Sequence, residues 1–212
     1  MQFLLDHALA VVAGSVLLIA ALTLQTQSRL HAVQETVSDA ARARAVSLGE
    51  VLAEEFDNVL SEPQATEFFG AHLCRLRRDP SDSVTERVEV PTYVRSTPTS
   101  LPTPGHVRYR LLADVDSVQT SDTWLLTYDL VREVDLGAGY SAPDTVGTGI
   151  VDFDVVFGGR ATETTSGTPP IRFRQIGFEI AVAMPDLAGE RRFHNVARVS
   201  HVIRPPNLTV GT

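Results

Sequence analysis

Hydrophobic residues are concentrated at the amino end of the chain. Ala8 to Leu24 contains no charged residue, and Phe3 to Leu5 extends this apolar stretch across Asp6. Farther along, apolar residues recur at helical spacing between polar ones until about Leu60. The pattern predicts one helix from Phe3 to Leu60, on the order of 90 Å long at ~1.5 Å per residue. A globular protein of this size has no room to bury such a rod.

The two parts of this predicted helix have different surfaces. Residues 3–24 are apolar on every side, and Leu4 to Leu24 is close to the ~20 residues that cross a bilayer. No Lys or Arg precedes the apolar run, which disfavours a cleavable secretory signal. We therefore predict a membrane-spanning or filament-core half at 3–24 and an amphipathic half at 25–60 that packs on a domain. Its apolar face consists of Leu30, Val33, Val37, Ala41, Leu48, Leu52, Phe56 and Val59.

The remainder of the chain, 61–212, is typical of a β-rich head domain. A shorter helix is expected from Gln64 to Arg78, interrupted at Gly70, and alternating patterns then predict strands. The fold class is α+β: a long amino-terminal helix packed on an antiparallel sheet of four to six strands, the last two forming a hairpin. The expected strands are Val84–Val94, Val107–Val115, Trp124–Val134, Ile150–Phe157, Ile171–Met184 and Arg191–Ile203.

Charge and cysteine content exclude several classes of protein. The chain has 18 basic and 26 acidic residues, a formal net charge of −8, and every basic residue is Arg. This acidic balance disfavours nucleic acid as a partner because phosphate backbones would be repelled. The single cysteine, Cys74, can form no internal disulfide, and we interpret it as an inert, half-buried thiol.

Motifs for catalysis are missing from the sequence. It has no phosphate-binding loop with Lys, no His-Glu-x-x-His and no Gly-x-Ser-x-Gly, so we expect neither an enzyme nor a cofactor or metal requirement. Two pairs of acids, Asp114 with Asp116 and Asp152 with Asp154, have the spacing of calcium ligands on a strand. The position of each pair on the solvated polar face of an alternating strand explains these acids better than calcium binding does. His194 and His201 are likewise expected to be surface or hairpin residues rather than metal ligands.

An apolar helix leading into a strand domain resembles the type IV pilins and the type II secretion pseudopilins. Phe3-Leu4-Leu5-Asp6 is similar to the aromatic start and acidic residue of these proteins. The later strands are similar in order to those of the minor pilins of the J or W class. The segments that carry this similarity are Trp124–Arg132, Gly149–Phe157 and Ile171–Ile180.

The resemblance implies a structural subunit of a pilus or pseudopilus filament. It implies other pilin-like subunits as partners, and a location in the bacterial inner membrane and periplasm or in an extracellular filament. Phe3, Asp6 and Gly14 become the candidate assembly residues. Asp6 would pair with the amine of a neighbouring subunit, or else lie at the membrane interface without a special function. The helix near Gly14 would lose helical order in the filament. Gly14 could equally serve close helix packing among small neighbours.

A second interpretation needs no filament. The chain could be a single-pass, membrane-anchored envelope protein whose β domain binds a soluble partner. The loops Ser96–Gly105 and Gly158–Pro170, rich in Ser, Thr, Pro and Gly, would then recognise that partner.

Overall fold

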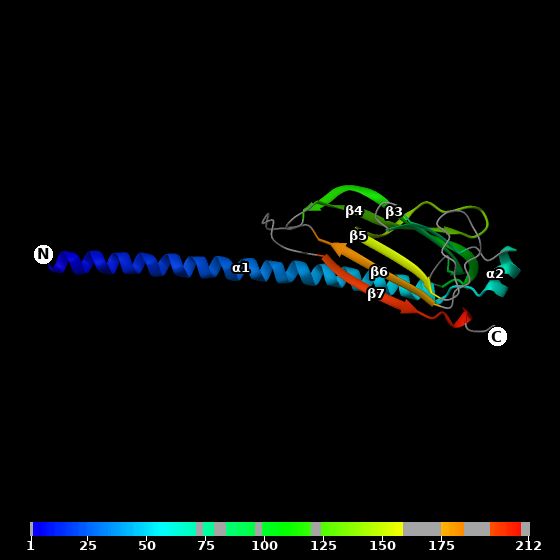
Figure 1. The fold of residues 1–212 in the computed structure, drawn as a ribbon, viewed down its shortest axis with the longest axis horizontal. Helices are drawn as coiled ribbons and strands as arrows, with labels where there is room; N and C mark the ends of the chain where they lie inside the picture. Colours follow the sequence, from blue (N-terminus) through cyan, green and yellow to red (C-terminus); the bar gives the residue numbers. More distant parts are fainter. Residues whose placement is uncertain are drawn as a thin grey trace.

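A computed structural model describes residues 2–70, 74–78, 84–95, 99–119, 124–158, 175–184 and 196–208. Its longest element, α1, is one unbroken helix over Gln2–Asp57, about 85 Å in length at ~1.5 Å per residue. The carboxyl-terminal half of α1 lies along the sheet, whereas the amino-terminal half projects beyond it (Figure 1). The predicted long helix is thus confirmed, and it ends three residues before the expected Leu60.

The second helix is shorter than predicted. α2 spans Glu62–Phe69 and begins with a capping box in which Ser61 and Gln64 bond each other's backbone and side-chain groups. It ends at Gly70, whose backbone is left-handed with φ of 72°. The helix predicted from Gln64 to Arg78 is wrong beyond this glycine, because the left-handed cap stops the helix and residues 75–78 form a strand instead.

The strands form one antiparallel sheet in sequence order, β1-β2-β3-β4-β5-β6-β7. Among the described residues this gives seven strands, more than the four to six expected, and β1 is the strand that was predicted as helix. The pairing of β6 with β7 confirms the terminal hairpin. The bounds are β1 Arg75–Arg78, β2 Thr85–Val94, β3 Thr103–Gln119, β4 Trp124–Asp135, β5 Asp144–Gly158, β6 Gln175–Ala183 and β7 Val196–Ile203.

A register shift in β5 changes which residues face the core. Strict alternation predicted that Val151 shares a face with Phe153, but Ile150 is the buried residue and Val151 is half-exposed. The pairing with β6 skips one position between Ile150 and Asp152, as expected of a β-bulge. Gly149, with φ of 72°, lies at this irregularity, and a Cβ there would approach the Ala183 carbonyl oxygen to 2.7 Å.

The core lies between α1 and the inner face of the sheet. The helix stripe predicted from periodicity is buried from Val37 onward, while Leu30 and Val33, nearer the amino end, remain partly or largely exposed. Gly49 permits close contact with β7, because a Cβ there would lie 3.0 Å from His201 Nε2 and 3.1 Å from Val199 Cγ1. The largest fully buried side chains are Tyr109, Phe56, Phe153, Leu52, Leu60, Leu130, Ile150, Ile176, Ile180, Val59, Val88 and Val90.

Candidate assembly site

The amino-terminal half of α1 exposes a continuous apolar surface. Its large side chains are between 54% and 70% exposed, and an 18-residue window has a mean hydropathy of 2.1 with none of its residues buried. The helix is long and apolar enough to cross a membrane. A surface of this extent is unusual for a soluble monomer and indicates contact with lipid or with other apolar helices. The exposed residues are Leu9, Val11, Val12, Val16, Leu17, Leu18, Ile19, Leu22 and Leu24.

The three candidate assembly residues all lie in this half of α1. The side chains of Phe3 and Asp6 fall outside the described part of the structure. Gly14 is helical, and a Cβ added to it would meet nothing within 4 Å. Ser15, beside it, donates a hydrogen bond from its hydroxyl to the Val12 carbonyl oxygen at 2.8 Å. Gly14 therefore leaves a gap between the side chains on the helix surface, and no other part of the described chain fills this gap.

A charged residue attaches the other half of α1 to the sheet. Glu55 accepts hydrogen bonds from Arg132 of β4, at 2.7 Å from Nε and 2.5 Å from Nη2, and from the hydroxyl of Tyr109 on β3. These three residues, which we call the helix anchor, face the core side of the sheet. Burial, and then the Glu55 charge, raise the pKa of Tyr109 far above its usual value. The hydrogen bond to Glu55 raises the pKa of Arg132, so this guanidinium stays charged.

The helix anchor was not identified from the sequence. Glu55 adjoins Phe56 within the amphipathic part of the predicted helix, where one more acid among many carries no distinguishing signal. Arg132 belongs to a strand segment quoted for the pilin resemblance, but its partner depends on the register between helix and sheet. The available clue was that Glu55 directly precedes Phe56, a member of the apolar stripe, so that its charge lies at the border of the helix face that packs on the sheet.

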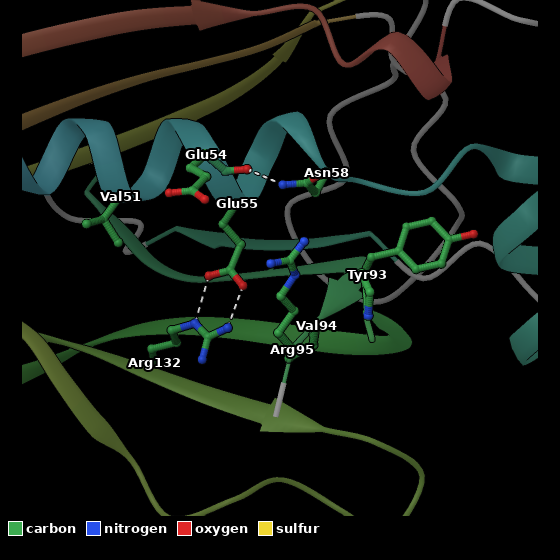
Figure 2. A pocket seen from close by; sticks show the side chains of 9 residues that line it. Val51, Glu54, Glu55, Asn58, Tyr93, Val94, Arg95 and Arg132 are labelled. Atoms are coloured by element: carbon green, nitrogen blue, oxygen red, sulfur yellow. Dashed lines mark hydrogen bonds and ion pairs between the residues drawn. The ribbon is translucent and has the colours of Figure 1, made fainter. Parts of the chain in front are cut away.

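A cavity of about 600 Å³ adjoins the helix anchor (Figure 2). Glu54 and Glu55 line it from α1, Arg95 extends into it from the end of β2, and Arg132 faces it from β4. Asn58 donates a hydrogen bond to the Glu54 carbonyl oxygen at 2.7 Å and completes the rim. The cavity is polar, and its described lining contains no Ser, Cys or His nucleophile.

The face of the sheet opposite α1 carries a second polar cluster. Arg108 contacts Glu89 at 2.9 Å and Glu133 at 3.3 Å, and its guanidinium carbon lies 3.4 Å from the centre of the Tyr140 ring. Tyr140 donates a hydrogen bond to Glu89 at 2.6 Å. Burial alone would raise the pKa of Glu89, but the hydrogen bonds from Tyr140 and Arg108 and the Arg108 charge outweigh it, so the pKa is lowered.

Histidine and cysteine side chains are held in packing contacts. His201 lies in β7 of the terminal hairpin, where it is half-buried and stacks on Phe178 at a ring separation of 5.3 Å. His106 lies 4.2 Å from the Phe69 ring of α2, and burial lowers its pKa. Cys74 is buried, which raises the pKa of its thiol and keeps it protonated. His194 lies outside the described residues.

Of the two acidic pairs considered as calcium ligands, the structure describes the side chains of one, and both of its members form ion pairs with arginines. Asp152 forms an ion pair with Arg198 at 2.8 Å, and Asp154 forms one with Arg78 at 2.9 Å. The side chains of Asp114 and Asp116 lie outside the described part. Within the described part, no three His, Cys, Asp or Glu side chains are grouped so that they could hold a metal ion.

The predicted loops are described only in part. Thr103 to Gly105 are the first residues of β3 rather than loop, and Leu101 just before them is 85% exposed. Residues 96–98 and 159–174 lie outside the described structure.

Comparisons with protein families, with curated proteins and with solved structures found no match for this chain.

Proposed function

We propose that this chain is a structural subunit of a pilus-like or type II secretion pseudopilus filament, rather than an enzyme. The observation that carries the proposal is the exposed apolar half of α1, which continues without a break into the half that is packed on the sheet. One rigid element then joins an apolar assembly surface to a folded head. The order of elements, a long helix followed by an antiparallel sheet, agrees with the pilin resemblance.

The apolar half serves two environments in turn. Before assembly it spans the bacterial inner membrane, with the head in the periplasm. In the filament it packs against the equivalent helices of other subunits. Because this step replaces one apolar environment by another, packing and polar pairing determine the register of the subunits. Gly14 and its small neighbours Ala10 and Ala13 give the neighbouring helix room for close approach, and Asp6 pairs with a subunit amine.

The helix anchor supports the transmission of force in this arrangement. A pull on the apolar half of α1 reaches the sheet through the buried stripe and through the contacts of Glu55 with Arg132 and Tyr109. The end of the helix is also tied to β2. The Leu60 N–H donates to the Pro91 carbonyl oxygen at 2.9 Å, and the Thr92 hydroxyl donates to the Asn58 carbonyl oxygen at 2.9 Å.

Electron microscopy of sheared surface fractions, with an antibody against the head, tests the proposal. We expect the antibody to label thin filaments, along their length for a principal subunit or at their ends for a minor one. Protein found solely in the membrane fraction, with no labelled filament, would contradict it. That outcome would favour the membrane-anchored, partner-binding protein.

A further inference from the structure

Three arginines stand side by side on the face of the sheet opposite α1. The register pairs Arg77 of β1 with Arg87 of β2, and Arg87 with Arg110 of β3. Directly opposed residues of antiparallel strands point to the same face with Cβ atoms about 4.5–5.5 Å apart. Three positive charges so placed repel one another unless anions lie among them.

Carboxylates of the chain form ion-pair contacts with the two outer arginines, whereas the central Arg87 acts on Glu89 through its charge alone, without such a contact. Arg77 forms an ion pair with Glu86 at 2.7 Å, and Arg110 forms one with Glu133 at 2.7 Å. Within the described structure, the central Arg87 has neither an ion pair nor a hydrogen bond, and its Nε is buried without a partner. Buried N–H groups are normally paired, so this donor requires an acceptor from outside the chain.

The arginine row borders a cavity of about 360 Å³. Besides the three arginines, its lining includes Glu86, Leu111 and Tyr128. The net charge of the whole chain is −8, so this site is a local exception to an acidic molecule. Guanidinium groups present planar, paired N–H donors that match the two oxygens of a carboxylate or phosphate group.

We propose that this cavity binds the phosphate or carboxylate group of a small ligand, and that Arg87 is its principal contact. The bound oxyanion accepts hydrogen bonds from the Arg87 guanidinium and reduces the repulsion along the row. This inference does not depend on filament assembly, because it concerns the head and is tested on dispersed protein.

The test measures thermal unfolding of the full chain in detergent, titrated with inorganic phosphate, with acetate, or with chloride at matched ionic strength. We expect a saturable rise in Tm with phosphate or acetate beyond that in chloride, since a ligand that binds only the folded state stabilises it. Whichever of phosphate and acetate raises the Tm more identifies the chemical group that the cavity prefers. Arg87→Gln should weaken the apparent affinity at least tenfold.

Two further variants keep the result interpretable. Arg87→Lys retains the charge without the planar fork and should bind the anion with intermediate affinity, even if Arg87→Gln folds poorly. Arg42→Gln, on the exposed surface of α1, should respond as the wild type does. An equal rise in chloride, or an undiminished response in the folded Arg87 variants, would overturn the proposal.

Discussion

At the scale of single residues, the helix anchor shows how a charge can be accommodated between a helix and a sheet. Glu55 is partly buried, and both of its carboxylate oxygens accept hydrogen bonds from Arg132. The hydroxyl of Tyr109, a fully buried residue, donates a third. Because the donors lie on two neighbouring strands, β3 and β4, the contact specifies one position of α1 along the sheet.

We predict that Glu55→Gln lowers the free energy of unfolding by about 2 kcal/mol, because it leaves the Arg132 guanidinium without its counter-charge. Glu54→Gln is the matched control, since Glu54 is exposed and its carboxylate has no partner in the described structure. Chemical unfolding of both variants in detergent measures the difference. Equal stability of the two would show that the ion pair contributes nothing beyond its desolvation.

Glu89 predicts a dependence of stability on pH. Its pKa is lowered from 4.5 in the folded protein, so its contribution is complete above the unfolded pKa and is lost as the pH falls through the lower folded pKa. Tyr140→Phe removes one of the hydrogen bonds that stabilise the carboxylate. We expect the variant to lose less stability than the wild type on acidification below about pH 4.5.

Denaturant midpoints measured from pH 7 to pH 3 provide this comparison. Protonation of His106 also contributes in the acid range, because burial lowers its pKa. His106 is present in both proteins, and the Glu89 charge raises its pKa, so the difference between the two curves reports Glu89 together with its coupling to His106. Parallel curves for the wild type and Tyr140→Phe would show that the tyrosine hydroxyl does not stabilise the Glu89 carboxylate.

At the scale of elements, α1 belongs to two environments. Its stripe from Val37 to Phe56 forms one wall of the core, whereas the stretch from Leu9 to Leu24 has no contact partner within the described chain. The same local preference for helix serves both halves, because helical hydrogen bonds are satisfied within the element in lipid and in water alike. What differs is the distribution of apolar side chains around the helix.

Leu52→Ala tests whether the second half of α1 is part of the core. Leu52 is fully buried, so its truncation should cost about 2–5 kcal/mol through lost burial and the cavity left behind. Val51→Ala, at a position 45% exposed, should cost far less. Thermal unfolding, followed by the near-ultraviolet circular dichroism of the aromatic side chains, measures both variants. If both substitutions lowered the stability equally little, the sheet would fold independently of α1.

At the scale of the whole molecule, the apolar half of α1 and the folded head are joined by one continuous helix (Figure 1). The projecting half is exposed in the isolated chain, so other molecules must cover it. In the proposed filament, the helices of neighbouring subunits do so. The head then lies outside, where the polar face of the sheet and the arginine cavity remain accessible.

Asp6→Ala tests the proposed role of this residue in assembly. An ionisable group within the apolar region costs roughly 2–3 kcal/mol unless it is paired or reaches the interface. The variant should therefore insert into the membrane at least as well as the wild type. Filament yield should fall roughly tenfold or more, because the pairing that sets subunit register is lost.

Membrane fractionation and counting of sheared filaments measure the two effects separately. Glu35→Ala, which removes an exposed acid from the amphipathic part of α1, is the control and should assemble normally. Normal assembly of Asp6→Ala would exclude Asp6 from the mechanism while leaving the filament proposal intact. Failure of both variants to assemble would indicate a general requirement for negative charge.

The sequence alone determined the elements whose signals are local. A run of apolar residues without charge, followed by a stripe at helical spacing, is sufficient to predict α1 and most of its buried face. Alternation likewise located β2, β4 and the β6–β7 hairpin. These predictions succeeded because periodicity reports directly which side of an element meets the core.

Tertiary structure decided everything that depends on register. Arg75 to Arg78 consists of good helix formers, so the sequence predicts helix there, whereas pairing with β2 makes the segment the strand β1. The partner of Glu55, the row around Arg87 and the bulge beside Ile150 follow from how strands align across a sheet. A shift of one residue would turn each side chain to the opposite face, and no local pattern contains that information.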